Sequence, residues 1–171
     1  MARVVVTHVV IARASEPFSP PSFSPSVSFS TLLVWWLFEA ELLEDPVVRG
    51  VALLTSSGTP LALSGELDDG AAAPVDWSSF AAAASAILCH DPEVSAEPLA
   101  AHTDGVHLGA LRFTILRSGP ADIDALGTPE HEFVLKVAAL PWRLLIVALA
   151  CKQDARHLRA VTEELASRLR A

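Results

Sequence analysis

The side chains in this sequence that could do chemistry are, first of all, its histidines. Two of them, His102 and His107, flank Asp104 where a loop leads into an expected strand. Imidazole and carboxylate groups are ligands for zinc and related ions. The spacing of these histidines is not a recognised ligand pattern, and surface histidines in a loop are the commoner explanation. A metal or small-ligand site around them is kept as a minor hypothesis, and no metal is expected.

Cysteines and paired carboxylates are the next candidates for chemistry. Cys89 and Cys151 lie 62 positions apart without CxxC spacing, which excludes a disulfide framework and a cysteine-rich zinc site. A reduced compartment is the default for such a chain. Cys89 follows an expected helix, whose negative end disfavours a reactive thiolate, so we predict a small core residue there. Asp122 and Asp124 fall in the Gly- and Pro-containing stretch 119–130, which predicts a loop with both carboxylates facing water.

Catalytic and nucleotide-binding motifs are missing from the sequence. It holds no GxxxxGK[ST] phosphate loop and no GxGxxG after a strand. A GxSxG nucleophile elbow and an HExxH metalloprotease helix are also missing. With no constellation to support catalysis, we expect a protein that is not an enzyme, with no catalytic residues and no cofactor.

Length and charge limit the class of protein further. The chain has 171 residues, one ordinary domain, with a formal net charge of −8 and a composition that is 51% hydrophobic. It is too apolar to be disordered and too acidic for general nucleic-acid binding through phosphates. Residues 39–104 carry twelve acids and one base, whereas 152–171 carry five bases and three acids. This asymmetry favours charged protein partners, although a merely solvated surface is the simpler reading.

The first 30 residues differ from the rest. An apolar stretch between Arg3 and Arg13 precedes a segment rich in Ser, Pro and Phe. A signal or transit peptide would fit part of this pattern, but a disordered extension or a misplaced start codon fits better. We therefore assign 1–30 as an extension and 31–171 as the domain. The apolar run 133–151 has the length of a membrane span, but its charged residues and proline argue against one.

In the first half of the chain, proline, glycine and capping residues mark where the helices and strands begin and end. A helix is expected from residue 31 until Asp45-Pro46 ends it. Two β-rich runs, 47–55 and 60–64, then flank a turn in which Gly58 is placed for a left-handed conformation. Asp76 is a natural N-cap, and apolar residues at helical spacing from Trp77 to Leu88 predict a helix that Asp91-Pro92 stops.

The second half predicts three strands and a helix. The strands are expected at 106–117, 133–140 and 142–150, and an amphipathic helix at 154–170. The order is therefore α-β-β-α-β-β-β-α. Its fold class is α+β, with a single five-stranded antiparallel sheet and the helices packed on one face.

The segment from Glu44 to Gly65 resembles the first hairpin of the roadblock/LC7 family. That family has a helix, a "GV-apolar" strand, a Gly turn and a second short strand, as in Gly50-Val51 and Gly58 here. The element order from Leu32 to Leu149 is also similar to this family. Within it, the step Gly65-Glu66-Leu67-Asp68-Asp69 most resembles the fifth subunit of the Ragulator (late endosomal/lysosomal adaptor, LAMTOR) complex. The resemblance implies a profilin-like fold.

The same resemblance implies a scaffold without chemistry of its own. Roadblock domains pair through the central helix and an edge strand, here 77–89 and 106–117, and present a platform to small GTPases. The implied interface residues are Trp77, Phe80, Ala84, Ile87, Leu111, Phe113 and Ile115; Gly50, Gly58 and Gly65 are the implied fold glycines.

Partners are implied by the same family. They are other roadblock subunits and Rag- or Ras-type GTPases, with no nucleic acid and with membranes reached only through partners. The Ragulator likeness implies TOR signalling at the late endosome, lysosome or vacuole, from the cytoplasmic side. The alternative is a roadblock dimer that serves as a dynein light chain or directly regulates a Ras-like GTPase. A third hypothesis is a small enzyme or ligand-binding domain around His102 and His107.

Overall fold

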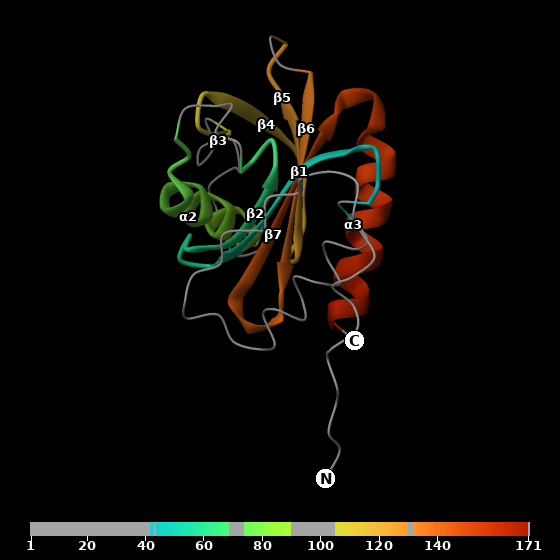
Figure 1. Ribbon diagram of the computed structural model, residues 1–171. Helices are drawn as coiled ribbons and strands as arrows, with labels where there is room; N and C mark the ends of the chain where they lie inside the picture. The colour runs from blue at the N-terminus through green and yellow to red at the C-terminus, as the bar shows by residue number, and fades with distance from the viewer. Residues whose placement is uncertain (1–41, 43, 69–73, 90–104, 130–131, 171) are drawn as a thin grey trace, which may run out of the picture.

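The computed structural model describes residues 42, 44–68, 74–89, 105–129 and 132–170 (Figure 1). The predicted extension 1–30, nearly all of the predicted helix before Asp45, and the His102 half of the histidine pair lie outside these residues. Leu42 is described and fully buried, in contact with the cluster that includes Val51 and Leu165.

One antiparallel sheet forms the centre of the described fold. It has seven strands in the order β2-β1-β7-β6-β5-β4-β3. The strands are β1 (Val48–Thr55), β2 (Pro60–Gly65), β3 (Val106–Leu108), β4 (Leu111–Ser118), β5 (Asp122–Gly127), β6 (Phe133–Leu140) and β7 (Leu144–Cys151). β1 and β7 pair over their full length, so the first and the last strand of the described chain are neighbours in the sheet.

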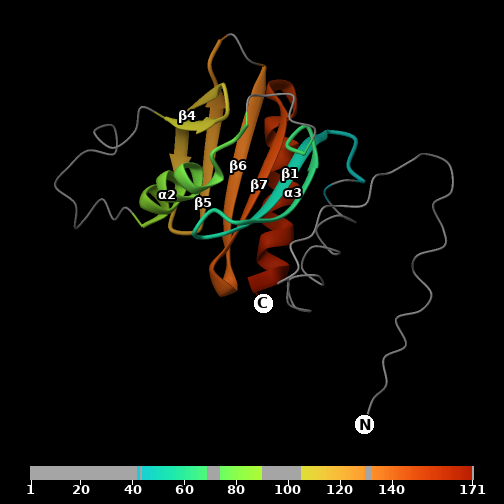
Figure 2. The same cartoon turned by 60° about the vertical axis from the view of Figure 1, so that its left-hand side comes forward.

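Helices cover both faces of this sheet (Figure 2). α2 (Trp77–Leu88) packs on the face to which Ala52 and Val147 point, and α3 (Ala155–Arg170) on the opposite face with Val51 and Ile146. Successive strand residues point to opposite faces, so β1 and β7 are apolar on both sides because both are covered. The prediction that all helices share one face was wrong.

The β1–β2 hairpin is confirmed, including its glycine turn. Gly58 has φ +85°, and an added Cβ would collide with the backbone of Trp77 and Ser78. Gly65 (φ +63°) also has a left-handed conformation, and Gly50 lies directly beneath Leu67. Side chains are rarely tolerated in this backbone region, which explains glycine at positions 58 and 65. That these glycines are fold positions of the family stays a prediction.

The prediction of five strands was wrong, for two local reasons. The single strand expected at 106–117 is split into β3 and β4 by a tight turn at Gly109 and Ala110, where Gly109 has φ +57°. The loop expected at 119–130 contains β5, which alternates buried and half-buried residues and pairs with both neighbours.

The C-terminal elements match their predictions closely. β6 has the predicted bounds, β7 begins two residues later than predicted, and α3 begins at Ala155. Among the described residues, no helix combines the length and hydropathy needed to cross a membrane.

Candidate interaction surfaces

The apolar face of α2 is turned into the protein. Asp76 caps the helix: its carboxylate accepts hydrogen bonds from the Ser79 amide (3.1 Å) and hydroxyl (2.6 Å). Phe80, Ala84 and Ile87 are buried in the core between α2 and the sheet. These three predicted interface residues are therefore not available to a partner while the domain is folded.

The other predicted interface residues, on β4 and at the start of α2, differ in their burial. Phe113 is fully buried, whereas Trp77, Leu111 and Ile115 are half-buried at the margin of the same core. The interface prediction is thereby reduced to these three side chains, for which it stays a prediction.

The outward face of α2 carries small residues beside a sheet edge. Ser78, Ser79, Ala82 and Ala86 are exposed. α2 packs against β3, a three-residue strand at the edge of the sheet with one pairing neighbour. Among the described residues, α2, whose outer face lacks bulky side chains, thus lies next to a strand edge that has no pairing partner there.

A buried charge cluster lies on the other face, which the sequence analysis did not foresee. Lys136, on β6, is only 2% exposed, and its Nζ lies 2.6 Å from Asp122, 2.7 Å from Asp124 and 3.2 Å from Glu163. Two guanidiniums complete the cluster: Arg117 lies 3.6 Å from Asp122, and Arg159 lies 2.9 Å from Glu163. The expectation that Asp122 and Asp124 simply face water was wrong, because β5 places both against Lys136.

Opposite charges set the protonation of this cluster. Burial alone would lower the pKa of Lys136, but the hydrogen bonds and charges of Asp122 and Asp124 outweigh it and raise that pKa above its ordinary value. Burial would raise the pKa of Glu163, yet hydrogen bonds from Arg159 and Lys136 lower it. Lys136 and Glu163 are therefore both charged at neutral pH, and their ion pair holds α3 to the sheet.

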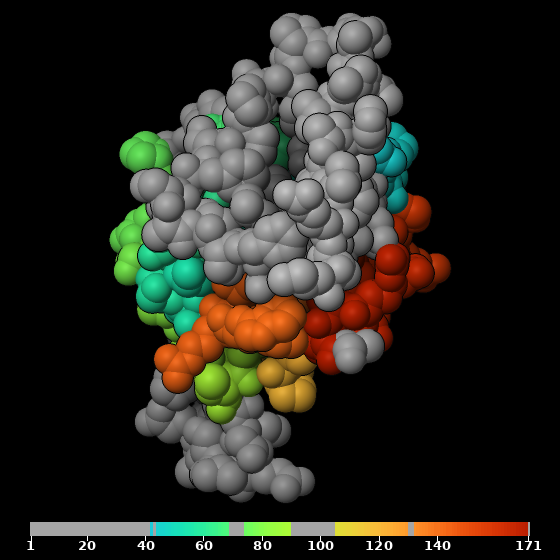
Figure 3. Space-filling view, turned by 60° about the horizontal axis from the view of Figure 1, so that its bottom comes forward, coloured from blue at the N-terminus to red at the C-terminus, as the bar shows by residue number. Residues whose placement is uncertain are grey.

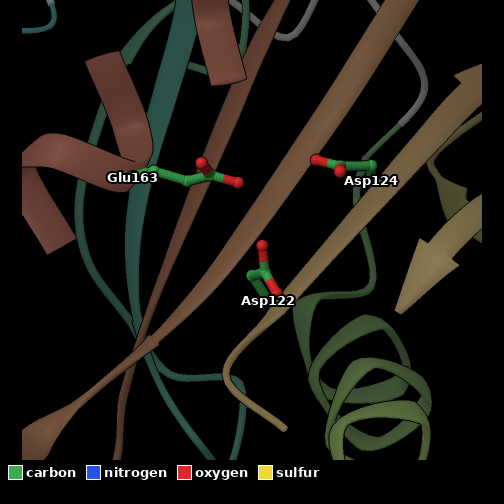
Figure 4. A group of neighbouring side chains, drawn as sticks. All are labelled: Asp122, Asp124 and Glu163. Atoms are coloured by element: carbon green, nitrogen blue, oxygen red, sulfur yellow. The ribbon is translucent and has the colours of Figure 1, made fainter. Parts of the chain in front are cut away.

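The three carboxylates also have the arrangement of a possible cation site. Their oxygens lie within 4.8 Å of one another and point toward a common centre (Figure 4). The ammonium of Lys136 already contacts all three of them. A positive charge supplied by the chain occupies the position that a metal ion would need, so we assign the cluster to structure.

Of the remaining titratable and nucleophilic candidates, those that the structure describes are exposed, except for Cys151, which is half-buried. His107 is exposed on β3, and His157 on α3 bonds to the Asp45 carboxylate at 2.5 Å. Burial would raise the pKa of Asp45, but the hydrogen bond from His157 lowers it. Cys89 is exposed at the end of α2, so its prediction as a core residue was wrong.

An apolar pocket of about 480 Å³ opens on the α2 side of the sheet. Its lining is Leu63, Glu66, Leu67, Asp68, Pro74, Val75, Trp77, Leu108, Leu111, Phe133 and Leu149. The carboxylates of Glu66 and Asp68 are its only charged groups among these residues. Glu66 is paired with Arg49 at 2.8 Å, whereas the Asp68 side chain is exposed.

Two large apolar side chains are strongly exposed among the described residues. Leu116, on β4, is 63% exposed, and Trp142, in the turn between β6 and β7, is 66% exposed. Neither residue was singled out as a candidate site by sequence, because strand periodicity reports the inward side chains only.

A mixed-order antiparallel sheet with α2 on one face and α3 on the other defines a profilin-like fold. Acanthamoeba castellanii profilin IA is similar, with a TM-score of 0.56 and 20% identity over 77% of this chain and 91% of that chain. LokiProfilin2, solved in complex with rabbit actin, has a TM-score of 0.60 and 9% identity over 80% of this chain and 95% of its own. At these identities the likeness establishes the fold alone.

The structural neighbours also include a roadblock/LC7 domain from Streptomyces avermitilis. Its TM-score is 0.44 and its identity 17%, over 79% of this chain and 92% of that chain. No protein-family model matches the sequence, and the comparison with curated proteins gave no match.

Proposed function

We propose that this chain is a non-catalytic scaffold domain of the roadblock type, which pairs with a second domain of the same kind. The observation that supports it is the adjacency of the α2 outer face and the β3 edge. Small side chains such as Ala82 and Ala86 let a second helix approach closely, and an edge strand offers unpaired backbone groups to a partner strand.

In the fuller form of the proposal, the pair belongs to a Ragulator-like assembly. It supports Rag-type GTPases in amino-acid and TOR signalling at the lysosome or vacuole, and partners hold it at the membrane. This form is supported by two resemblances. The Glu44–Gly65 hairpin resembles the roadblock/LC7 family, and the Gly65–Asp69 step resembles its Ragulator subunit. The alternative is a roadblock dimer that acts as a dynein light chain or directly regulates a Ras-like GTPase.

Affinity purification of the tagged full chain from its native host, with mass spectrometry of bound proteins, tests the proposal. We expect other roadblock subunits together with Rag-type GTPases. Ala82→Arg should abolish their recovery because it places a guanidinium on the outer face of α2. Ala160→Arg, on the exposed side of α3, is the matched control and should retain them.

Recovery of motor chains or of one Ras-like GTPase would favour the alternative. If wild type and Ala82→Arg recover the same partners in equal amounts, α2 is not part of the interface. A monomer without partners at any concentration would contradict both forms.

A profilin-type actin-binding module is the second candidate. It is favoured by the match to LokiProfilin2 in its complex with rabbit actin, which covers 95% of that protein. Sedimentation of the purified chain with monomeric actin separates the two candidates. A stable complex with actin would favour this second function over the scaffold.

A further inference from the structure

The turn between β6 and β7 holds two bulky residues in an unfavourable backbone conformation. Trp142 (φ 63°, ψ 23°) and Arg143 (φ 58°) both lie in the left-handed region, the only described non-glycine residues with positive φ. Glycine or asparagine adopts this conformation at lower cost and is preferred in tight hairpins. Trp142 is 66% exposed, so the core gains little from it. Strained positions of this kind concentrate at functional sites.

The chemistry of this turn is that of an interface anchor. Trp and Arg are the residue types most enriched where interface binding energy concentrates. Arg143 is exposed, and Arg170 lies close by, since its guanidinium donates to the carbonyl of Ala139 at 2.7 Å. The turn thus presents an indole with positive charge on an acidic chain. Figure 3 shows this end of the molecule, with the turn in orange beside the end of α3 in red.

The apolar pocket has the complementary chemistry. Leu67, Phe133 and Leu149 line it, and the carboxylate of Asp68 is exposed at its margin. Its volume of about 480 Å³ is within the range of sites that bury whole small molecules, which are larger than an indole. The exposed carboxylate of Asp68 is opposite in charge to Arg143, whereas Glu66 is already paired with Arg49.

The turn does not occupy the pocket of its own chain. Trp142 is 66% exposed and is not among the residues that line the pocket. Phe133, at one end of the pocket, begins β6 about 23 Å from Leu140, where the turn starts, whereas Trp77 at the other end lies against Gly58, nearer to the turn. Figure 1 shows the β6–β7 turn at the bottom and the start of β6 at the top.

We infer that the β6–β7 turn docks into the apolar pocket of a second copy of this chain, with the Trp142 indole in the pocket and Arg143 beside Asp68. The two surfaces differ, so the contact is head-to-tail and each copy keeps one free turn and one free pocket. Such contacts build rings or filaments rather than closed pairs. The contact does not use Ala82 or Ala86, but Trp77 at the start of α2 and Leu108 on β3 line the pocket, so the docking site borders the surface of the proposed pairing.

Sedimentation velocity of the full chain in the Ala82→Arg background tests the inference, because that substitution removes pairing through α2. We expect species that grow with concentration. Trp142→Asn and Asp68→Arg should each stop the growth, and the double variant Asp68→Arg/Arg143→Asp should restore it. Leu116→Asn is the control, since it removes a side chain of equal exposure elsewhere and should leave assembly unchanged.

Mixing the two blocked variants gives the sharpest result. The Trp142→Asn chain keeps a working pocket, and the Asp68→Arg chain keeps a working turn. Together they should form a complex of one copy each and nothing larger. The melting temperature of Trp142→Asn should equal or exceed that of the parent, which separates lost docking from lost folding.

Three outcomes would overturn the inference. One is a parent chain that stays a single species at the highest concentration reached, and another is growth that survives Trp142→Asn. The third is an equal loss with Leu116→Asn. If the parent does not self-associate but Trp142→Asn alone loses a co-purified protein, the occupant is a different partner and the second-copy inference is wrong.

Discussion

Replacing Lys136 by methionine is expected to destabilise the domain strongly at neutral pH. The substitution removes the buried ammonium that contacts Asp122, Asp124 and Glu163 and leaves their carboxylates facing one another. Removing one partner of a buried ion pair costs about 3–5 kcal/mol. Arg117 and Arg159 still lie within 4.0 Å of these acids, so we expect the lower end, about 3 kcal/mol.

The loss should depend on pH in a defined direction. The lowered pKa of Glu163 stabilises the wild type above the ordinary glutamate range, and that stability is lost as the pH falls through the lowered value. The raised pKa of Lys136 stabilises below the ordinary lysine range, so its contribution is complete at pH 7 and lost only at strongly alkaline pH. In Lys136→Met, Glu163 loses the hydrogen bond and the charge of the lysine, so its pKa returns toward the ordinary glutamate value. The difference in stability should therefore shrink to about 1–2 kcal/mol near pH 4.

Urea unfolding followed by circular dichroism, at a series of pH values, measures this difference. The triple variant Lys136→Met/Asp122→Asn/Asp124→Asn is the control, because it removes the unpaired charges together with the lysine. It should recover most of the loss, to within about 1 kcal/mol of wild type. A loss below about 1 kcal/mol at pH 7, or one that grows toward pH 4, would refute the electrostatic reasoning.

Three further predictions concern the core, the first hairpin and the surface. Phe113→Ala should cost about 3–5 kcal/mol in urea unfolding, because its ring is fully buried between α2 and the sheet. Gly58→Ala should cost about 2 kcal/mol or more by the same assay, since it combines a left-handed conformation with a collision against Trp77; an unchanged stability would contradict the turn geometry. His157→Gln should raise the pKa of the Asp45 carboxyl toward its ordinary value in an NMR titration, and no change would mean that their hydrogen bond is absent in solution.

The parts of the fold that local signals determine were predictable. The first hairpin follows from Gly58 between two β-rich runs, and α2 from the Asp76 cap and an apolar face at helical spacing. α3 follows from its amphipathic period in the same way. In each case one short stretch carries both the element and its boundary, so no distant contact is needed to decide it.

The sequence analysis did not predict β5, because the residues that precede it are typical of a loop. Gly119 and Pro120 favour a loop, but the side chains of Asp122–Gly127 alternate between half-buried and buried, with Ile123 and Ala125 on the core side. Lys136 was a second signal for β5, after this alternation. It is the one charged residue of β6, and a buried charge needs an oppositely charged partner close by. Asp124 pairs with it directly in the register of β5 and β6. The pairing of these two residues is a tertiary contact. It can be predicted from the sequence only when the two segments are considered together.

The candidate interface shows a different limit, because periodicity reports burial without saying what buries a side chain. Phe80 and Ile87 have the spacing of an interface helix, and the domain's own sheet covers them. What α2 leaves to a partner is a face of serines and alanines, with Trp77 at one end. A face so nearly flat offers close approach but little discrimination between partners. In the pairing that we propose, specificity then comes from the backbone register at the β3 edge and from the half-buried Leu111 and Ile115 beside it.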